Sequence, residues 1–393
     1  MRSRNIPILG LSQVLSVSGV ALLSLLGGLI GTDLSPSPAW VTLPVSLVTV
    51  GVALSTIPAA LLMSRIGRRK GFAAAAGLAS IASLLAAYAV QQRSFTLFCL
   101  ATFLIGINGA FVQQYRFAAA ESVEAEHSAR AVSLVLVGGI VAGFLGPELA
   151  KWTKDWLPTG LYTGSFVTVA ALYALAAILL SFIRDARPAA DGPASGGRPL
   201  REIVLQPTYL MALLAGAVAY GVMTFTMTST PIYMRNMQGF TLDDTAWVIQ
   251  SHIMAMYLPS LFTGFLLERL GTVRIMLAGC LALFTSMALA LISHNLMHFW
   301  GTLVLLGIGW NFLFVGGTVL LTRSYRPEER FKAQAANDFS IFFMQAFTSL
   351  SAGTVLFYAN WEVLNLINLP FILLTLAVLL VFRRRIAAEP ATS

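Results

Sequence analysis

The sequence predicts an all-α membrane protein in which twelve transmembrane helices form two pseudo-symmetric six-helix bundles. Hydrophobic residues make up 57% of the 393 residues, and charged residues make up only 11%. A soluble protein of this length could not bury so much apolar surface in its cores, so lipid must be the solvent. Apolar runs as long as a membrane span recur along the chain, and short motifs of the first half return in the second half.

Each crossing of the hydrocarbon core needs a helix of about 20 predominantly apolar residues. In the first half, the runs that meet this length are residues 6–30, 40–62, 72–90, 96–119, 131–150 and 161–183. In the second half, they are residues 209–233, 247–267, 273–293, 299–321, 339–358 and 363–382. The first run is too long for the core of a signal peptide, so we expect it to remain as a helix.

A polar segment, residues 184–207, separates the sixth apolar run from the seventh. It contains Pro, Gly, Ser and charged residues, a composition typical of a linker. The expected domains are an N-terminal six-helix bundle (residues 1–183), a cytoplasmic linker (residues 184–207) and a C-terminal six-helix bundle (residues 208–393).

A short basic hairpin between the second and third apolar runs fixes the expected orientation. Its cations are Arg65, Arg68, Arg69 and Lys70. Positive charge is retained on the cytoplasmic side during insertion. Of the 25 Lys and Arg residues, the opposite side would hold only Arg93, Lys151, Lys154 and Arg235. We therefore expect both termini in the cytoplasm, in a multi-pass protein of the cell inner membrane.

The two halves carry related motifs at matching positions. Arg65-Ile66-Gly67 follows the second apolar run, and Arg269-Leu270-Gly271 follows the eighth. Residues 104–108 of the fourth run also match residues 306–311 of the tenth, and each motif ends in an Asn near the middle of its span. Internal repeats of this kind favour a secondary transporter.

The hairpin motifs extend further than these three residues. Residues 60–69 read Ala-Leu-Leu-Met-Ser-Arg-Ile-Gly-Arg-Arg, and residues 264–271 read Gly-Phe-Leu-Leu-Glu-Arg-Leu-Gly. Over essentially its full length the chain resembles the major facilitator superfamily, whose hairpin reads Gly-x-x-x-Asp-Arg-x-Gly-Arg-Arg. In the first half, Ala60 and Ser64 replace the Gly and the Asp. The resemblance implies that the hairpins act as conformational latches through Arg65, Gly67, Arg68, Glu268, Arg269 and Gly271.

A second family motif lies in the fifth apolar run, where Gly138, Gly143, Gly146 and Pro147 form a Gly-Pro pattern. Small residues at this spacing let helices approach closely, and proline bends a helix. In the family this pattern is associated with antiporters. The Arg that drug exporters often carry early in the fourth helix is replaced here by Thr102, which argues against drug efflux.

Arg116 is a cation inside the fourth apolar run, where a charge is costly and must face a cavity or a partner. Gln113 lies one turn away, on the same helical stripe as Gly109, so backbone can approach the face that displays the cation. Two interpretations stay open. Arg116 binds a carboxylate, phosphate or electron-rich ring, or it forms a structural ion pair with an acid such as Glu121 or Asp338.

Two residues are candidates for carrying a coupling proton, His252 and Glu121. The unperturbed pKa of histidine is near 6.5, which suits proton coupling at physiological pH. The alternative is that His252 is a packing residue that forms hydrogen bonds, and that Glu121 lies near a span end where it is solvated.

Polar and aromatic side chains inside the spans are candidates for the substrate site. Tyr220, Thr224 and Thr228 form one stripe on the seventh helix, although the threonines could also bond back to their own helix. In the resembled family, helices one, four, seven and ten line the cavity. The resulting substrate-binding set is Gln13, Asn108, Gln113, Arg116, Tyr220, Thr224, Thr228, Trp310 and Asn311.

These features predict a secondary transporter that moves a small organic solute by alternating access. The sequence contains no ATP-binding P-loop, so we expect a gradient, by default of protons, to supply the energy. The Gly-Pro motif favours an exporter of drugs or metabolites. The aromatic and amide side chains, together with Thr102, favour an importer of a planar amphipathic nutrient such as a flavin-like vitamin.

Other function classes are disfavoured. The sequence has no HExxH and no Gly-x-Ser-x-Gly, so we expect no enzyme, no cofactor and no metal site. Cys99 and Cys280 both lie in apolar runs, which excludes a disulfide scaffold. The cations come in short separate groups, so nucleic acid is not an expected partner. No appended signalling domain supports a sensor. We expect a monomer whose partners are its substrate, the bilayer and protons.

Overall fold

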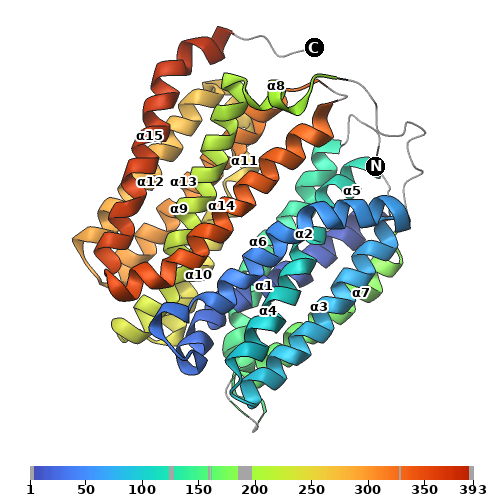
Figure 1. Cartoon of the computed structure of the whole chain (residues 1–393), viewed down its shortest axis with the longest axis vertical. Helices are drawn as coiled ribbons and strands as arrows, with labels where there is room; N and C mark the ends of the chain where they lie inside the picture. Colours follow the sequence, from blue (N-terminus) through green and yellow to red (C-terminus); the bar gives the residue numbers. More distant parts are fainter. Residues whose placement is uncertain are drawn as a thin grey trace. The chain divides into compact units, whose positions relative to one another are not determined.

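The computed structural model describes residues 4–123, 128–157, 160, 162–184, 197–326 and 329–388. Regular structure within these residues is helical throughout (Figure 1). The helices up to the linker are α1 (Asn5–Leu34), η1 (Pro38–Trp40), α2 (Leu43–Ile66), α3 (Arg68–Gln91), α4 (Phe95–Val112), α5 (Tyr115–Glu121), α6 (Ser128–Thr153) and α7 (Thr163–Ser181). Those that follow are α8 (Leu200–Val204), α9 (Pro207–Ile232), η3 (Tyr233–Met237), α10 (Leu242–Tyr257), α11 (Ser260–Leu270), α12 (Thr272–Ile292), α13 (Leu296–Thr322), α14 (Arg330–Tyr358) and α15 (Trp361–Ala388).

Ten of the described helices are long and apolar enough to cross a membrane. They correspond to ten of the predicted spans, although α4 ends at Val112 and so covers only the first part of residues 96–119. The helix α6 covers an eleventh span, residues 131–150. The predicted span 247–267 is not one helix, because α10 ends at Tyr257 and α11 begins at Ser260. Pro259 at this break has no N–H to donate to the preceding turn.

The predicted span 96–119 is also divided, into α4 and α5. The N–H of Gln113 still donates to the carbonyl of Gly109, whereas the N–H of Gln114 donates to Phe111 only three residues back. This tighter bond closes the last turn of α4. The expectation that Arg116 shares one continuous helix with Gly109 is therefore wrong, since Arg116 lies in α5.

The chain separates into two compact units. The first contains Met1–Arg187, Thr228–Met254 and Ser349–Tyr358, and the second contains Pro188–Met227, Ala255–Thr348 and Ala359–Ser393. The helices α9, α10 and α14 thus each contribute residues to both units. The division into bundles of residues 1–183 and 208–393 stays a prediction.

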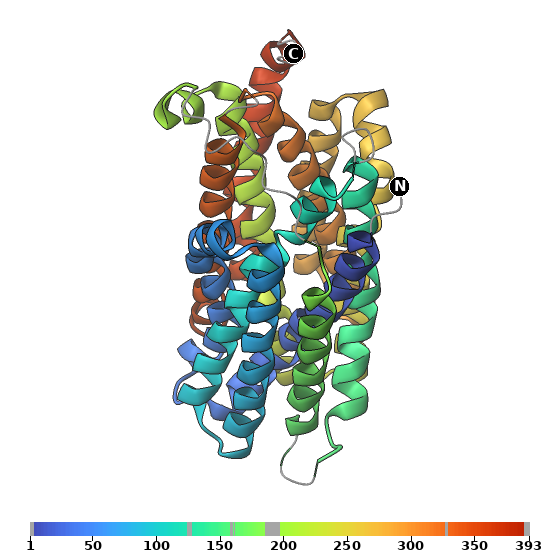
Figure 2. The ribbon, with the colours of Figure 1, turned by 90° about the vertical axis from the view of Figure 1, so that its right-hand side faces the viewer.

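In the first unit, close helix pairs are α1 with α6, α2 with α4, and α3 with α7 (Figures 1 and 2). Glycines make these approaches possible. A Cβ added to Gly146 would lie 2.6 Å from the carbonyl oxygen of Ser18 on α1, and one on Gly106 would lie 2.2 Å from the carbonyl oxygen of Val48 on α2. The small residues of the Gly-Pro motif therefore act as helix-packing positions.

In the second unit, α12 packs against both α13 and α15. A Cβ on Gly309 would lie 2.7 Å from the side chain of Leu283, so α12 and α13 touch at a glycine.

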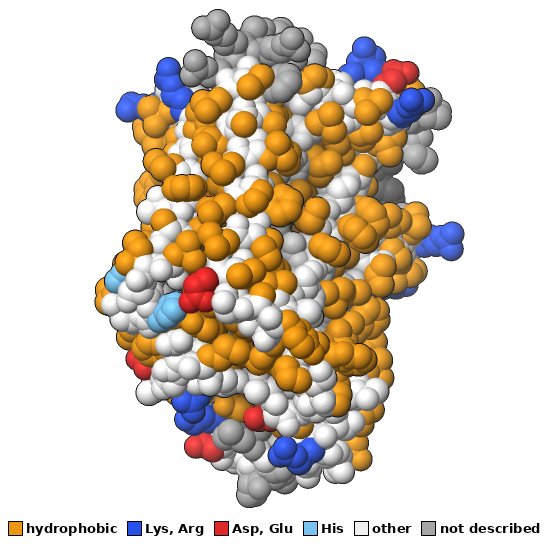
Figure 3. Space-filling model, turned by 60° about the vertical axis from the view of Figure 1, so that its left-hand side comes forward, with side chains coloured by type: hydrophobic (Ala, Val, Ile, Leu, Met, Phe, Trp, Pro, Cys, Tyr) orange, Lys and Arg blue, Asp and Glu red, His pale blue; other side chains and the backbone are white. Residues whose placement is uncertain are grey.

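Hydrophobic side chains cover most of the face shown in Figure 3. The outward side chains of α12 and α15 include Leu281, Phe284, Ile292, Phe371, Leu374 and Val381. A surface of this kind is suited to lipid contact.

The two basic hairpins bend in the same way. Gly67, between α2 and α3, has φ 84° and ψ 158°, and Gly271, between α11 and α12, has φ 86° and ψ 145°. Each N–H closes the preceding helix with a 3.0 Å hydrogen bond, to Met63 and to Leu267. These dihedral angles are accessible essentially to glycine alone. The repeat seen in the sequence is therefore a repeat of backbone geometry.

Candidate functional site

Five aromatic side chains of the second unit pack together, and we call them the aromatic cluster: Tyr220, Tyr257, Trp310, Phe314 and Phe342. The ring of Trp310 stacks on Phe314, with centroids 5.0 Å apart. Tyr220 meets both rings edge-on, at 5.2 Å in each case. Tyr220 also lies 5.9 Å from Phe342, and Tyr257 lies 6.2 Å from Trp310.

Local sequence explains how the cluster is assembled. Trp310 and Phe314 are four residues apart on α13, so their side chains share one face of the helix. Gly216 on α9 lets that helix approach α14, because a Cβ there would lie 2.4 Å from Ile341. Gly317 on α13 similarly lies close to the carbonyl of Ala212 on α9. Tyr220, one turn after Gly216, is thereby brought against the rings of α13 and α14.

Trp310 places a hydrogen-bond donor inside this cluster. Its side chain is 4% exposed, and in the part of the chain that the structure describes its indole Nε1 has no hydrogen-bond partner. A buried donor without a partner costs about 1–3 kcal/mol. An acceptor on a bound ligand would recover that cost.

Asn311, the neighbour of Trp310, makes hydrogen bonds across the break between α10 and α11. Its Nδ2 donates to the carbonyl of Met256 at 2.8 Å and to Oγ of Ser260 at 2.6 Å. Its Oδ1 accepts from the hydroxyl of Thr263 at 2.7 Å. Asn311 therefore joins the two helix ends beside Pro259, and its substrate-binding role stays a prediction.

Two amides of the first unit have buried oxygen atoms. Gln13 lies on α1 and Asn108 on α4, and both side chains are buried. Among the described residues, Oε1 of Gln13 and Oδ1 of Asn108 have no hydrogen-bond partner. Gln13 packs where α1 passes Gly138 of α6. Both oxygen atoms could accept from hydroxyl groups of a ligand.

The remaining predicted substrate residues are distributed differently. Thr224 is buried in the second unit, whereas Thr228 belongs to the first. The Thr228 hydroxyl lies 3.3 Å from that of Ser349, which lies 2.8 Å from that of Ser46. Thr228 thus takes part in a hydroxyl cluster that joins α9, α14 and α2.

Gln113 and Arg116 flank the turn between α4 and α5, and both are half-buried. The predicted acid partners of Arg116 stay predictions. The side chain of Glu121 lies outside the described residues, as does that of Glu268 in the second hairpin. Asp338 belongs to the second unit, and Arg116 belongs to the first.

His252 is fully buried on α10, where this helix contacts α6. A Cβ on Gly143 of α6 would lie 2.4 Å from Ile253. Gln250, two residues earlier on α10, donates to the carboxylate of Glu148 at 2.9 Å, and Glu148 pairs with Lys151 at 2.6 Å. Proton carrying by His252 stays a prediction.

The latch residues of the hairpins stay a prediction as a functional set. Their glycines, Gly67 and Gly271, form the bends described above. Arg65 and Arg269 are exposed, and the guanidinium of Arg269 lies 4.5 Å from the ring centre of Phe265. Arg68 is half-buried. Within the described residues, no group of three His, Cys, Asp or Glu side chains could hold a metal ion.

Sequence reasoning missed three members of the aromatic cluster, Tyr257, Phe314 and Phe342. The four-residue spacing of Trp310 and Phe314 could have indicated the stacked pair. Tyr257 and Phe342 come from other helices, and their place depends on how those helices are rotated in the fold.

A sequence profile of the Major Facilitator Superfamily matches residues 9–258 and 212–393. The chain belongs to this superfamily. This MFS transporter is 42% identical over 379 residues to the riboflavin transporter RfnT of Brucella anthropi, covering 96% of this chain and 95% of the relative. It is also 30% identical to the uncharacterized MFS-type transporter YdeG of Bacillus subtilis, covering 93% and 88%.

Solved structures show the same MFS fold. A bacterial homologue of the human lysosomal transporter Spinster, in an inward-facing and unoccupied conformation, matches with a TM-score of 0.71 at 17% identity. The match covers 99% of this chain and 96% of that one. Because it belongs to the superfamily, the chain is a multi-pass membrane transporter of a small molecule and not an enzyme.

Proposed function

We propose that this MFS transporter imports riboflavin or a closely related flavin-like vitamin. The observation that carries the proposal is the aromatic cluster around the buried indole N–H of Trp310. A flavin has a planar fused ring with two faces that can stack, and its edge carries carbonyl and ring-nitrogen acceptors. Such a ring needs apolar aromatic surface and a few placed donors. The 42% identity to RfnT supports the same substrate class.

The ribityl chain of riboflavin is the second recognition element. It carries hydroxyl groups, which can donate hydrogen bonds. Gln13 and Asn108 each present a buried oxygen that has no partner within the described residues. We assign the aromatic cluster to the ring of the substrate. Each of these two amides, taken within its own unit, offers an acceptor suited to a ligand hydroxyl group.

The direction and the coupling belong to the same proposal. Import agrees with Thr102 in place of the exporter Arg. A proton gradient drives the cycle, with His252 as the candidate carrier. The protein works as a monomer in the cell inner membrane with both termini in the cytoplasm. The transport cycle is alternating access by the bundles of residues 1–183 and 208–393, which residues 184–207 join.

Complementation tests the direction of transport. A bacterial strain that can neither make nor take up riboflavin should grow on low external riboflavin when it expresses this chain. An empty vector is the control. Growth only at high riboflavin, equal to the vector, would contradict import.

Binding and counterflow test the substrate. Riboflavin at about a hundred times its Kd should stabilise the purified protein by about 2.7 kcal/mol. Proteoliposomes loaded with riboflavin should accumulate labelled riboflavin, and lumichrome, which keeps the ring, should compete better than ribitol. Counterflow of lipophilic cations with none of riboflavin would instead identify a drug exporter.

A further inference from the structure

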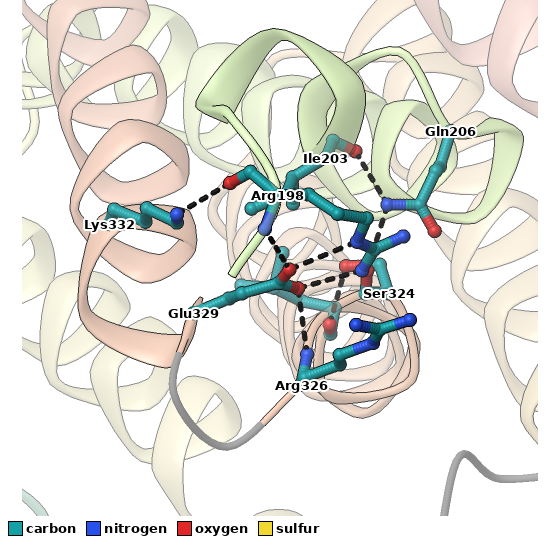
Figure 4. Close-up of polar contacts among 8 residues, drawn as sticks. Arg198, Ile203, Gln206, Ser324, Arg326, Glu329 and Lys332 are labelled. Carbon is teal, nitrogen blue, oxygen red and sulfur yellow. Dashed lines mark hydrogen bonds and ion pairs between the residues drawn. The ribbon is translucent and has the colours of Figure 1, made fainter. Parts of the chain in front are cut away.

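The end of the linker is docked on the second unit by one arginine. Arg198 precedes α8, and its guanidinium faces the carboxylate of Glu329, which precedes α14 (Figure 4). Nη2 of Arg198 lies 2.7 Å from Oε2 of Glu329, and Nε lies 3.0 Å from Oε1. This two-point geometry is the strong form of an arginine–carboxylate pair.

The Glu329 carboxylate is fully buried and fully occupied by donors. Besides the guanidinium, the backbone N–H of Arg198 donates to it at 2.7 Å, and that of Arg326 donates at 3.0 Å. These donors hold the pKa of Glu329 well below its usual range. Removing the Arg198 guanidinium would leave this buried carboxylate without its counter-charge.

The same residues connect the ends of three helices. Arg198 and Gln206, on either side of α8, both donate to the carbonyl of Ser324, just after α13, at 3.3 and 2.9 Å. Lys332 on α14 donates to the carbonyl of Arg198. We call this set the linker clip: Arg198, Gln206, Ser324, Glu329 and Lys332. A further bond, from the Tyr209 hydroxyl of α9 to the carbonyl of Ala333 at 3.1 Å, lies beside it.

The helices joined by the clip are those that carry most of the aromatic cluster. Tyr220 lies on α9, Trp310 and Phe314 on α13, and Phe342 on α14. Trp310 is separated from Ser324 by a helical distance of about 20 Å, so the clip does not touch a ligand in the cluster. It can act on the cluster only by fixing how the three helices lie against one another.

We infer that Arg198 and Glu329 are positioning residues for the aromatic cluster. They set substrate affinity by holding together the start of α9, the end of α13 and the start of α14. The choice of riboflavin as the substrate rests on the proposed function, whereas the mechanical connection of the three helices does not. Small shifts of a binding constellation are costly because stacking and hydrogen bonding depend on distances of a few tenths of an ångström.

The test compares three variants with a matched control. Arg198→Gln removes the charged fork, Arg198→Lys keeps the charge but not the fork, and Glu329→Gln keeps the shape but loses the charge. Arg201→Gln is the control, because Arg201 lies exposed in α8. Riboflavin Kd is measured by quenching of flavin fluorescence, at a temperature far below the melting point of each variant.

The positioning role predicts about tenfold weaker binding in Arg198→Gln and Glu329→Gln, an intermediate loss in Arg198→Lys, and no change in the control. Wild-type affinity in folded Arg198→Gln and Glu329→Gln would overturn it and leave the clip as a stability element only.

Hydrogen exchange separates the inference from the proposed function. In Glu329→Gln, backbone amides at the start of α9, the end of α13 and the start of α14 should exchange faster than in the wild type. The exchange rates of amides in α12 should not change. Faster exchange confined to residues 197–206 would overturn the mechanical connection. If the wild type binds no riboflavin, the proposed function fails, and the exchange result still decides the inference.

Discussion

The rings of Trp310 and Phe314 are stacked with their planes inclined by 19° and their centroids 5.0 Å apart, while Tyr220 meets both at nearly right angles. The stacked pair and its edge-on neighbour form an aromatic wall. Trp310 contributes one polar group to this wall, its indole N–H. The wall is built from two helices, so a substitution on either side should act on the same ligand group.

Trp310→Phe should weaken riboflavin binding by about three- to tenfold, because it keeps a ring and removes one hydrogen bond. The melting temperature of the ligand-free protein should change little, because removing a buried donor that has no partner in the described structure offsets the packing lost with the smaller ring. Flavin fluorescence titration gives the Kd. Trp156→Phe, at an exposed Trp, is the control. Equal affinity in Trp310→Phe and wild type would rule out the indole N–H as a recognition group.

Asn311→Ala should lower the unfolding free energy by about 1–3 kcal/mol, because it leaves the carbonyl of Met256 and the hydroxyl of Ser260 without their donor. Asn108→Ala is the matched variant from the other half. Compared with Asn311→Ala, it should lower the unfolding free energy less and weaken riboflavin binding more, since Oδ1 of Asn108 has no partner within the described residues. Thermal unfolding with and without ligand measures both effects. The opposite ranking of the two variants would contradict these assignments.

Gly67→Ala and Gly271→Ala should each destabilise the fold by about 1–3 kcal/mol, because alanine cannot adopt their positive φ without strain. Gly77→Ala and Gly264→Ala are controls within helices, where an added Cβ meets nothing within 4 Å. Those controls should be neutral or slightly stabilising. Melting temperatures in one detergent decide the comparison. Tolerance of alanine at both hairpins would mean that the bends are not fixed by glycine.

The linker clip should make stability depend on pH at the acid side. The pKa of Glu329 is lowered in the folded protein, so its contribution is complete above the unfolded value of about 4.3 and is lost as the pH falls toward the folded value. The melting temperature should therefore fall more steeply between pH 7 and pH 3.5 for the wild type than for Glu329→Gln. Parallel curves would show that this carboxylate does not link folding to pH.

His252→Gln should separate exchange from coupled transport. Riboflavin counterflow needs no net proton movement, so it should persist at a rate close to wild type. Accumulation driven by an imposed pH gradient should be lost, because glutamine cannot carry a proton. Both assays use the same proteoliposomes. Gradient-driven accumulation that survives the substitution would remove His252 from the coupling path.

Hydropathy predicted the membrane helices well because about 20 apolar residues are needed whatever the partner helices are. The breaks inside two of these runs follow from local detail instead. Pro259 was visible in the sequence, but the side chain that bridges its break, Asn311, comes from another helix. The paired Asn residues looked equivalent, yet Asn311 is occupied by hydrogen bonds and Asn108 retains an open acceptor.

The linker clip could not be predicted from the sequence, for a second reason. Arg198 and Glu329 lie 131 residues apart, and neither stands in a motif. In the sequence Arg198 is one of several charged residues of the linker, and only the fold brings it to a buried carboxylate. The family hairpins are the opposite case, because each is a local turn whose residues are adjacent in the chain.

The two hairpins share the same backbone bend but differ in their acidic residue. The first hairpin lacks the acidic residue of the family pattern and has Ser64 in its place, whereas the second keeps Glu268. The backbone turns in the same way in both, because glycine dihedral angles set the turn. The charge at these loops can therefore change while the bend of the hairpin stays the same. The acidic residue and the glycine turn are separate features of the motif, and each can be altered without the other.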